Sequence, residues 1–281
     1  MQKQILWLLW FQKKTNLKNK KNYMVEIHQT AIVSPKAKLG TDVKVGPFSI
    51  IHDDVEVGDG SIIDSHVVLY DGARLGNRVR LFQGVSVANT PQDLKFGNEV
   101  TYFYIGDETQ IREFVTLHRG THATGKSEIG KNCLIMAYTH VAHDCILGNN
   151  IILANGVQIG GHTEIEDHVI VGGLAGIHQF TKIGAHAMIG TNSKVTADVP
   201  PFLMVQGVPA RFEGINKVGL RRRGFTPDQL EAIKEAYRTL YLSGLLFSQA
   251  KEKIAKDLGH HEVVKNILDF IAKATRGIVR K

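Results

Sequence analysis

Residues 129–160 read IGKNCL-IMAYTH-VAHDCI-LGNNII-LANGVQ-IG, with an aliphatic residue at every sixth position. Helices and strands repeat every 3.6 and 2 residues, so neither produces this period. A six-residue repeat is typical of a parallel β-helix. Stepping by six from Ile27 to Val195, 26 of 29 positions hold Ile, Leu or Val, and the exceptions are Asp93, Glu99 and Ala123.

The repeat also predicts which side chains face inward. The aliphatic position and the small or β-branched position two residues before it should point into the core, and the other four outward. Cys133 and Cys145 fall on the small position, which predicts buried, reduced thiols and a cytoplasmic protein. Glycine often follows the aliphatic residue, as at Gly130 and Gly148, and we expect it to adopt the positive φ of a sharp corner.

The pattern resembles that of left-handed β-helices, in which three hexads form one triangular coil. Residues eighteen apart would then lie one above the other, about 4.8 Å away. The left-handed winding comes from this resemblance, because crossover connections are usually right-handed.

The repeat divides the chain into parts. Coils are expected over 25–201, with loops at about 88–104 and 121–128 where the repeat lapses; such loops often carry function. A connector over 202–225 and a helical domain over 226–281 follow. Its three helices are predicted near 226–244, 248–258 and 261–274, the first opening with the capping-box signal Thr226-Pro227-Asp228-Gln229.

The positive charge is concentrated at the start of the chain. The net charge is +7, but residues 1–23 hold six lysines and no acid, so the remainder is nearly neutral and nucleic-acid binding is disfavoured. The apolar run Ile5 to Phe11 is too short to span a bilayer, and no stable membrane insertion is expected. Residues 1–24 are interpreted as a disordered leader, with Met24 as a second candidate start and a basic membrane anchor as the alternative.

Eight of the thirteen histidines fall into three groups. His168 and His186 are eighteen apart and predict a stacked surface ladder. His140 and His143 flank the inward Val141 on the outer face, and Asp144 follows them. A third group occupies the corner position where glycine is common, and positive φ is the structural explanation for it; its members are His28, His52, His118 and His178.

One coil further on, Gly161 lies eighteen after His143 and His162 lies eighteen after Asp144. An imidazole beside an approachable backbone N–H suits acyl transfer, with a general base and an oxyanion donor. No serine or cysteine nucleophile is needed if the acyl donor is a thioester. Spacing alone leaves surface histidines, a zinc enzyme of the carbonic anhydrase type and a non-catalytic binding scaffold as alternatives.

Several motifs between residues 25 and 281 resemble the acyl-carrier-protein–UDP-N-acetylglucosamine O-acyltransferase family, which carries out the first step of lipid A synthesis. They are Pro91-Gln92-Asp93-Leu94-Lys95, Ile111-Arg112-Glu113, His118-Arg119-Gly120-Thr121, His140-Val141-Ala142-His143-Asp144-Cys145, Gly161-His162, His178-Gln179-Phe180, Asp198-Val199-Pro200-Pro201 and Gly219-Leu220-Arg221-Arg222-Arg223-Gly224-Phe225.

The resemblance implies a homotrimer without cofactor or metal, with active sites in clefts between neighbouring β-helices. A (R)-3-hydroxyacyl group would pass from acyl carrier protein to the 3-hydroxyl of UDP-N-acetylglucosamine, or to a 3-amino analogue.

The same resemblance implies residue roles. His143 would be the general base, Asp144 its orienter, and the Gly161 N–H the oxyanion donor. His178 would line the cleft. Sugar or acyl 3-hydroxyl contacts would come from Asp93, Lys95, His140, His162 and Gln179, and uridine and phosphate contacts from Asn216, Arg222 and Arg223.

Two positions depart from the family pattern. Thr191 stands where some members have glycine at the floor of the acyl channel, which predicts a shorter acyl chain. Lys217-Val218 stands where an acidic uracil contact can occur. The basic cluster Arg221 to Arg223 is open to four interpretations: pyrophosphate binding, carrier-protein docking, a solvated patch or a nucleic-acid contact, the last being the weakest because the rest of the chain is nearly neutral.

Overall fold

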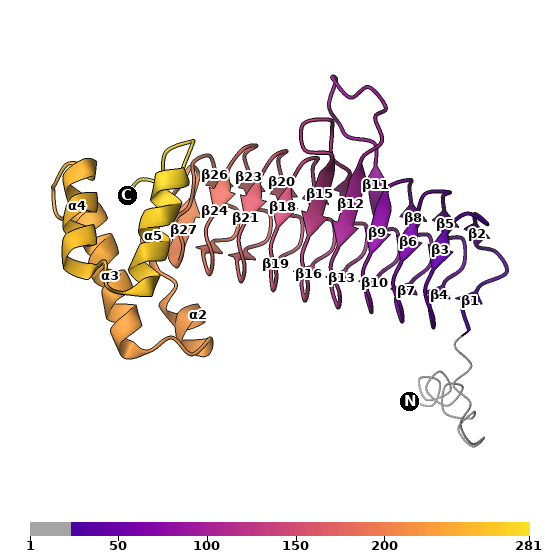
Figure 1. Cartoon of the computed structure of the whole chain (residues 1–281), viewed down its shortest axis with the longest axis horizontal. Coiled ribbons are helices and arrows are strands. Elements are labelled where there is room, and N and C mark those ends of the chain that lie inside the picture. The colour runs from indigo at the N-terminus through magenta and orange to yellow at the C-terminus, as the bar shows by residue number, and fades with distance from the viewer. Residues whose placement is uncertain (1–23) are drawn as a thin grey trace, which may run out of the picture.

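A computed structural model describes residues 24–281 of the protein; the predicted leader lies almost wholly outside this range. The described chain forms a long stack of coils followed by a cluster of helices (Figure 1). None of the helices within residues 24–281 is both long and apolar enough to cross a membrane.

Three sheets, parallel except for the last strand of the first one, form the sides of the stack, so the predicted triangular coil is confirmed. The first sheet contains β1 (Glu26–Ile27), β4 (Lys44–Val45), β7 (Ile62–Ile63), β10 (Arg80–Leu81), β13 (Gln110–Ile111), β16 (Leu134–Ile135), β19 (Ile152–Leu153), β22 (Ile170–Val171), β25 (Met188–Ile189), β27 (Leu203–Gly207) and β28 (Ala210–Ile215). The second contains β2 (Ile32–Val33), β5 (Ile50–Ile51), β8 (Val68–Leu69), β11 (Ser86–Asn89), β14 (Thr116–His118), β17 (His140–Val141), β20 (Gln158–Ile159), β23 (Gly176–Ile177) and β26 (Lys194–Val195). The third contains β3 (Lys38–Leu39), β6 (Glu56–Val57), β9 (Ala73–Leu75), β12 (Tyr102–Ile105), β15 (Lys126–Ile129), β18 (Ile146–Leu147), β21 (Glu164–Ile165) and β24 (Lys182–Ile183).

The register follows the predicted eighteen-residue step. Val45 pairs with Ile63, and Val141 pairs with Ile159. Across the first loop, paired residues are thirty positions apart in the sequence, as in Val87 with Leu117. Across the second loop they are twenty-four apart, as in Leu117 with Val141. The two loops therefore add twelve and six residues, and Figure 1 shows them protruding side by side from one edge of the stack near β11, β12 and β15.

The core consists of the two inward positions of each hexad. Most aliphatic residues and the smaller residues two places before them are buried, and Cys133 and Cys145 are buried free thiols, as predicted. Burial raises the pKa of the Cys133 thiol to about 11 and that of Cys145 to about 12. These thiols are therefore inert core residues.

The predicted reason for the glycines is wrong. Positive φ falls three residues after the aliphatic position, as at Asp144 and His162, and not on the glycine that follows it directly. A Cβ on Gly130 would lie 2.5 Å from the carbonyl oxygen of Gly148 in the next coil, so glycine is needed there for close approach between coils. The same error affects the corner histidines, since none of the four has positive φ: His28, His52, His118 and His178.

Residues 202–225 contain regular structure beyond the predicted connector. β27 joins the first sheet beside β25, with Met204 opposite Met188, and β28 turns back antiparallel to β27. The short helix α2 (Lys217–Arg222) follows. The stack is thus closed by a hairpin in place of a further coil.

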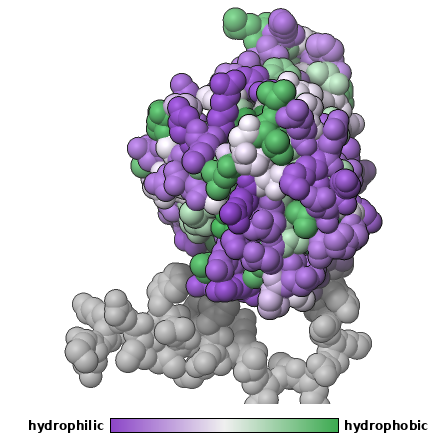
Figure 2. All heavy atoms as spheres, turned by 90° about the vertical axis from the view of Figure 1, so that its left-hand side faces the viewer, coloured by the Kyte–Doolittle hydropathy of each residue, from purple (hydrophilic) through white to green (hydrophobic). Residues whose placement is uncertain are grey.

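Three longer helices complete the chain: α3 (Pro227–Leu242), α4 (Phe247–Leu258) and α5 (Glu262–Lys273). The predicted capping box at Thr226 is present. The hydroxyl of the fully buried Tyr237 donates to the carbonyl of Pro201 at 2.6 Å, which joins α3 to the end of the β-helix. Figure 2 faces this helical end, where hydrophobic side chains appear as separate patches among polar ones. Division of the chain into these domains stays a prediction.

Candidate active site

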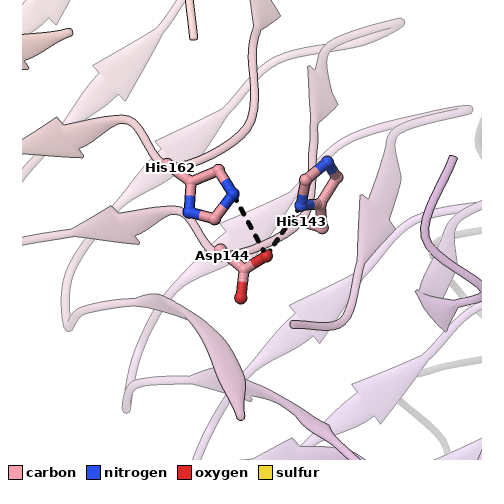
Figure 3. A group of neighbouring side chains, drawn as sticks. All are labelled: His143, Asp144 and His162. Atoms are coloured by element: carbon pink, nitrogen blue, oxygen red, sulfur yellow. Dashed lines mark hydrogen bonds and ion pairs between the residues drawn. The ribbon is translucent and has the colours of Figure 1, made fainter. Parts of the chain in front are cut away.

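His143 and Asp144 follow β17 at the corner between the second and third sheets. Asp144 has a φ of 60°, a conformation that aspartate tolerates better than most residues. This turn brings its carboxylate back beneath the neighbouring imidazole. His143 Nδ1 lies 2.7 Å from Asp144 Oδ2, as Figure 3 shows.

The Asp144 carboxylate is buried and fully engaged. It accepts hydrogen bonds from the N–H and the hydroxyl of Thr121, both at 2.9 Å, and from the hydroxyl of Thr124. Burial works against its charged form, but the hydrogen bonds from His143, Thr124 and Thr121 outweigh burial and hold the pKa of Asp144 well below its usual range. Asp144 is therefore a permanent anion beside His143.

This anion determines which nitrogen of His143 carries the proton. Nδ1 donates to the carboxylate, so Nε2 of the neutral ring is left as a proton acceptor. The imidazole side chain is 14% exposed, so it is partly shielded from water but open to a reactant. His143 thus has the orientation of a general base.

Gly161 lies one coil away, directly against the His143 ring. A Cβ on Gly161 would be 2.8 Å from His143 Cε1 and 2.9 Å from Nε2, so this position accepts only glycine without movement. Within residues 24–281 its N–H has no hydrogen-bond acceptor. At the third-sheet corners the N–H two residues after the aliphatic position is bound by a carboxylate or amide oxygen, as at Thr41 and Lys131. At the second-sheet corners on either side of Gly161, the N–H groups of His143 and Gln179 are likewise unbound within residues 24–281. Gly161 therefore offers a free donor beside the base.

His162 completes the group in Figure 3, with Nε2 at 3.7 Å from Asp144 Oδ2. Its ring stacks on Phe180 at 4.4 Å and meets His143 edge-on. Burial lowers the pKa of His162, an effect that the nearby carboxylates of Asp144 and Asp93 oppose. Asp93, on the first loop, is thus close enough to His162 to influence its charge.

His140 extends the cluster in the other direction along the second sheet. A 2.8 Å hydrogen bond joins its Nδ1 to Thr116 Oγ1, and its pKa is lowered by burial and then by His143. His118 contacts His140 edge-on, with ring centroids 4.8 Å apart. The sequence pattern did not predict this contact between His118 and His140. The two histidines are twenty-two residues apart, whereas the repeat places residues eighteen apart one above the other.

The remaining predicted residues near this corner occupy its rim. The Lys95 N–H donates to Asp93 Oδ1 at 3.0 Å, and the Lys95 side chain is exposed on the first loop. His178 and Gln179 are exposed at the end of β23, one coil beyond Gly161, and His178 Nδ1 lies 3.1 Å from the Gln179 carbonyl. Within one chain, Asp93 and Lys95 thus lie on the first loop, and His178 and Gln179 lie on the coil next to Gly161.

The predicted nucleotide contacts lie elsewhere on the same chain. Asn216 is buried and caps α2: its Oδ1 accepts from the Gly219 N–H at 3.1 Å and its Nδ2 donates to the His186 carbonyl. Arg223 lies near His168 and His186, which stack at 4.7 Å as predicted. His168 and His186 lie at the corner after the third sheet, whereas His143 lies at the corner after the second sheet. Within one chain, the predicted nucleotide contacts are therefore not brought to His143.

Arg222, Arg223 and Thr191 differ in exposure. Arg222 is exposed, whereas burial lowers the pKa of Arg223, and one of its buried terminal nitrogens has no partner within residues 24–281. Thr191 is exposed at the corner after β25, between the first and second sheets. The predicted site residues thus occupy all three corners of the triangle.

His143, Asp144 and His162 also have the composition of a metal site, with their ligand atoms within 4.8 Å of one another. However, the oxygen of Asp144 that faces both histidines already accepts the Nδ1 proton of His143 and the hydroxyl proton of Thr121. A metal ion would have to displace these protons. The arrangement therefore favours proton transfer over metal binding.

The sequence of this chain is similar to those of known enzymes. The family described as UDP N-acetylglucosamine O-acyltransferase, domain 2, matches residues 198–279, and the bacterial transferase hexapeptide family matches residues 36–71 and 126–161. The acyl-[acyl-carrier-protein]–UDP-N-acetylglucosamine O-acyltransferase of Thiobacillus denitrificans is 50% identical over 258 residues, covering 92% of this chain and 100% of that protein. The Stenotrophomonas maltophilia enzyme of the same name is 49% identical, with 90% and 97% covered.

Solved structures agree with the sequence relatives. LpxA from Acinetobacter baumannii superposes with a TM-score of 0.88 at 42% identity, covering 90% of this chain and 99% of that one. The UDP-N-acetylglucosamine acyltransferase of Francisella novicida gives a TM-score of 0.89 at 38% identity, with 92% and 94% covered. With the left-handed β-helix thereby confirmed, the chain belongs to the acyl-[acyl-carrier-protein]–UDP-N-acetylglucosamine O-acyltransferase family.

Proposed function

We propose that this protein transfers a (R)-3-hydroxyacyl group from acyl carrier protein to the 3-hydroxyl of UDP-N-acetylglucosamine, the first step of lipid A synthesis. The names of its relatives support the two substrates. The observation that carries the mechanism is the contact between His143, oriented by Asp144, and Gly161 with its free N–H.

In the proposed reaction, the sugar hydroxyl attacks the thioester carbonyl carbon while His143 Nε2 removes the hydroxyl proton. The carbonyl oxygen becomes an oxyanion that accepts the Gly161 N–H. When the carbon–sulfur bond breaks, the carrier thiolate leaves and takes the proton back from His143. Asp144 stays ionised throughout and stabilises the transient imidazolium.

The rim residues supply the proposed substrate contacts. Lys95 is an exposed cation on the first loop, and His140, His162 and Gln179 offer further hydrogen-bonding groups. We assign these residues, with Asp93, to the sugar and the acyl 3-hydroxyl, and His178 to the cleft wall.

The nucleotide contacts require a second chain. Arg222 and Arg223 lie at a different corner from His143, so one substrate can reach both sets only if a neighbouring subunit contributes one of them. Planar guanidinium groups suit the pyrophosphate, and the unpartnered buried nitrogen of Arg223 supports an anionic ligand. Asn216 contributes by holding α2 in place.

An exposed apolar row supports the proposed homotrimer. Four side chains on the corner after the first sheet are 48–68% exposed in the isolated chain, and two of them stack with centroids 5.4 Å apart. An apolar row of this kind marks a protein interface. Its members are Phe48, Phe114, Tyr138 and Leu174. We propose that a partner subunit covers it, and that the trimer acts in the cytoplasm without a cofactor.

The decisive experiment replaces His143 by alanine. Acyl transfer should fall by roughly a thousandfold, since a positioned base contributes 10²- to 10⁴-fold, while gel filtration still shows the trimer. His28→Ala, in the first coil, is the matched control and should leave turnover unchanged. Near-normal turnover of His143→Ala would rule the mechanism out.

A second arm addresses the zinc alternative. Dialysis against a chelator should leave the transfer rate unchanged if His143 works through its proton. Loss of activity on chelation, restored by zinc, would favour the metal-dependent reaction instead.

A further inference from the structure

The Asp144 carboxylate depends on one short segment of the chain. Three of its four hydrogen bonds come from Thr121 and Thr124, which lie in the six residues inserted between β14 and β15. The fourth comes from His143. The insertion therefore supplies nearly all the donors that keep a buried anion beside the imidazole.

Thr121 is the better donor of the two threonines. Its hydroxyl accepts the Ala123 N–H at 3.2 Å, which leaves its single proton free to point at Asp144. The Thr124 hydroxyl, by contrast, is within bonding distance of both Asp144 and the Lys126 carbonyl, and one proton serves only one of them. Thr121 also contributes its N–H, so it binds both oxygens of the carboxylate.

The segment that carries Thr121 is held firmly. The Gly125 N–H donates to the Thr121 carbonyl at 2.8 Å, and Gly120 packs so closely against Lys126 that a Cβ there would lie 2.4 Å from the Lys126 nitrogen. The His122 N–H donates to Glu99 of the first loop at 2.9 Å. Thr121 therefore presents its hydroxyl from a fixed backbone.

We propose that Thr121 is a positioning residue for acyl transfer, acting through Asp144 on His143. It holds the carboxylate so that Oδ2 faces His143 Nδ1, which in turn keeps the imidazole against Gly161. Thr124 assists. The proposal rests on the acyltransferase mechanism given above, and adds to it the reason why one hexad is inserted at this point of the repeat.

The test separates the hydroxyl from the shape of the side chain. Thr121→Val keeps the shape and the N–H but loses the hydroxyl, and should lower kcat by roughly tenfold, a fraction of what a positioned base contributes, with KM nearly unchanged. Thr121→Ser keeps the hydroxyl and should restore most of kcat. Equal kcat values for the two variants would overturn the proposal.

Thr101→Val is the matched control. Thr101 is 3% exposed, like Thr121, but its hydroxyl has no partner among the described residues, so this variant should keep both kcat and stability. Thermal melts of all variants identify any loss of folding.

A double variant tests the route of action. If Thr121 acts through the base, Thr121→Val should add no further loss of rate in the His143→Ala background. A full tenfold additional loss would mean that Thr121 acts independently of His143. An active His143→Ala protein would refute the mechanism itself, whereas an inactive one with a fully active Thr121→Val would refute only this inference.

Discussion

Replacing Gly161 by alanine tests the geometry of the site with a single methyl group. The new Cβ would lie 2.8 Å from His143 Cε1, 2.9 Å from Nε2 and 3.3 Å from Nδ1. Carbon atoms in contact prefer about 3.5–4.0 Å. The imidazole must therefore retreat by at least about 0.7 Å, against its hydrogen bond to Asp144.

The backbone itself should accept alanine, because φ at Gly161 lies outside the left-handed region. The effect should consequently appear in catalysis and not in folding. Misplacement of a catalytic group by about 1 Å costs on the order of 100-fold, so we expect kcat to fall by roughly that factor. Release of the carrier thiol, followed with a thiol reagent, measures it.

Gly176→Ala is the control, because a Cβ at that position meets nothing within 4 Å. This variant should have the turnover and melting temperature of the unmodified protein. A Gly161→Ala enzyme with kcat within threefold of normal would refute the reasoning, as would a structure of that variant with His143 unmoved.

Other parts of the molecule give three further predictions. Thr191→Gly should shift the preference towards longer acyl chains, measured with carrier thioesters of graded length; an unchanged preference would remove Thr191 from the acyl channel. Tyr237→Phe should cost about 1–2 kcal/mol of stability through loss of the bond to Pro201, with activity retained, and unchanged urea unfolding would contradict this. Burial lowers the pKa of His118 and His186 from 6.5 to about 4, so the unfolded chain binds protons more readily between these values. Stability should be constant above pH 6.5 and fall as pH drops towards 4, less steeply in His186→Gln; an equally steep fall in that variant would exclude His186 as a contributor.

The period of the aliphatic residues carried most of the fold prediction. It identified the core positions, the vertical register and the approximate positions of both loops, because a parallel stack repeats the same environment at every rung. It could not distinguish two reasons for glycine. A corner that needs positive φ and a corner that passes close to the next coil both select Gly, and only the backbone angles of Gly130 and its equivalents separated them.

Spacing alone predicted the site only where it follows the eighteen-residue step, and residues such as Asp93 and Arg223 came from the family resemblance. Gly161 and His162 were found this way from His143 and Asp144. Thr121 and His118 were not, because the inserted hexad changes the spacing between them and the catalytic pair. The hairpin of β27 and β28 was missed for a similar reason, since Met204 pairs with Met188 at a distance of sixteen residues.

Up to β26, the separations between paired strands are eighteen, twenty-four and thirty residues, all multiples of six. Deletion of one residue inside residues 129–160 would shift the register of the hexads that follow by one position. Their aliphatic side chains would then point towards water and no longer into the core. Whole hexads, in contrast, can enter or leave at a corner without altering the coils beyond it. Length variation in this protein should therefore occur in sixes, and new binding loops can be grafted onto it by the same rule.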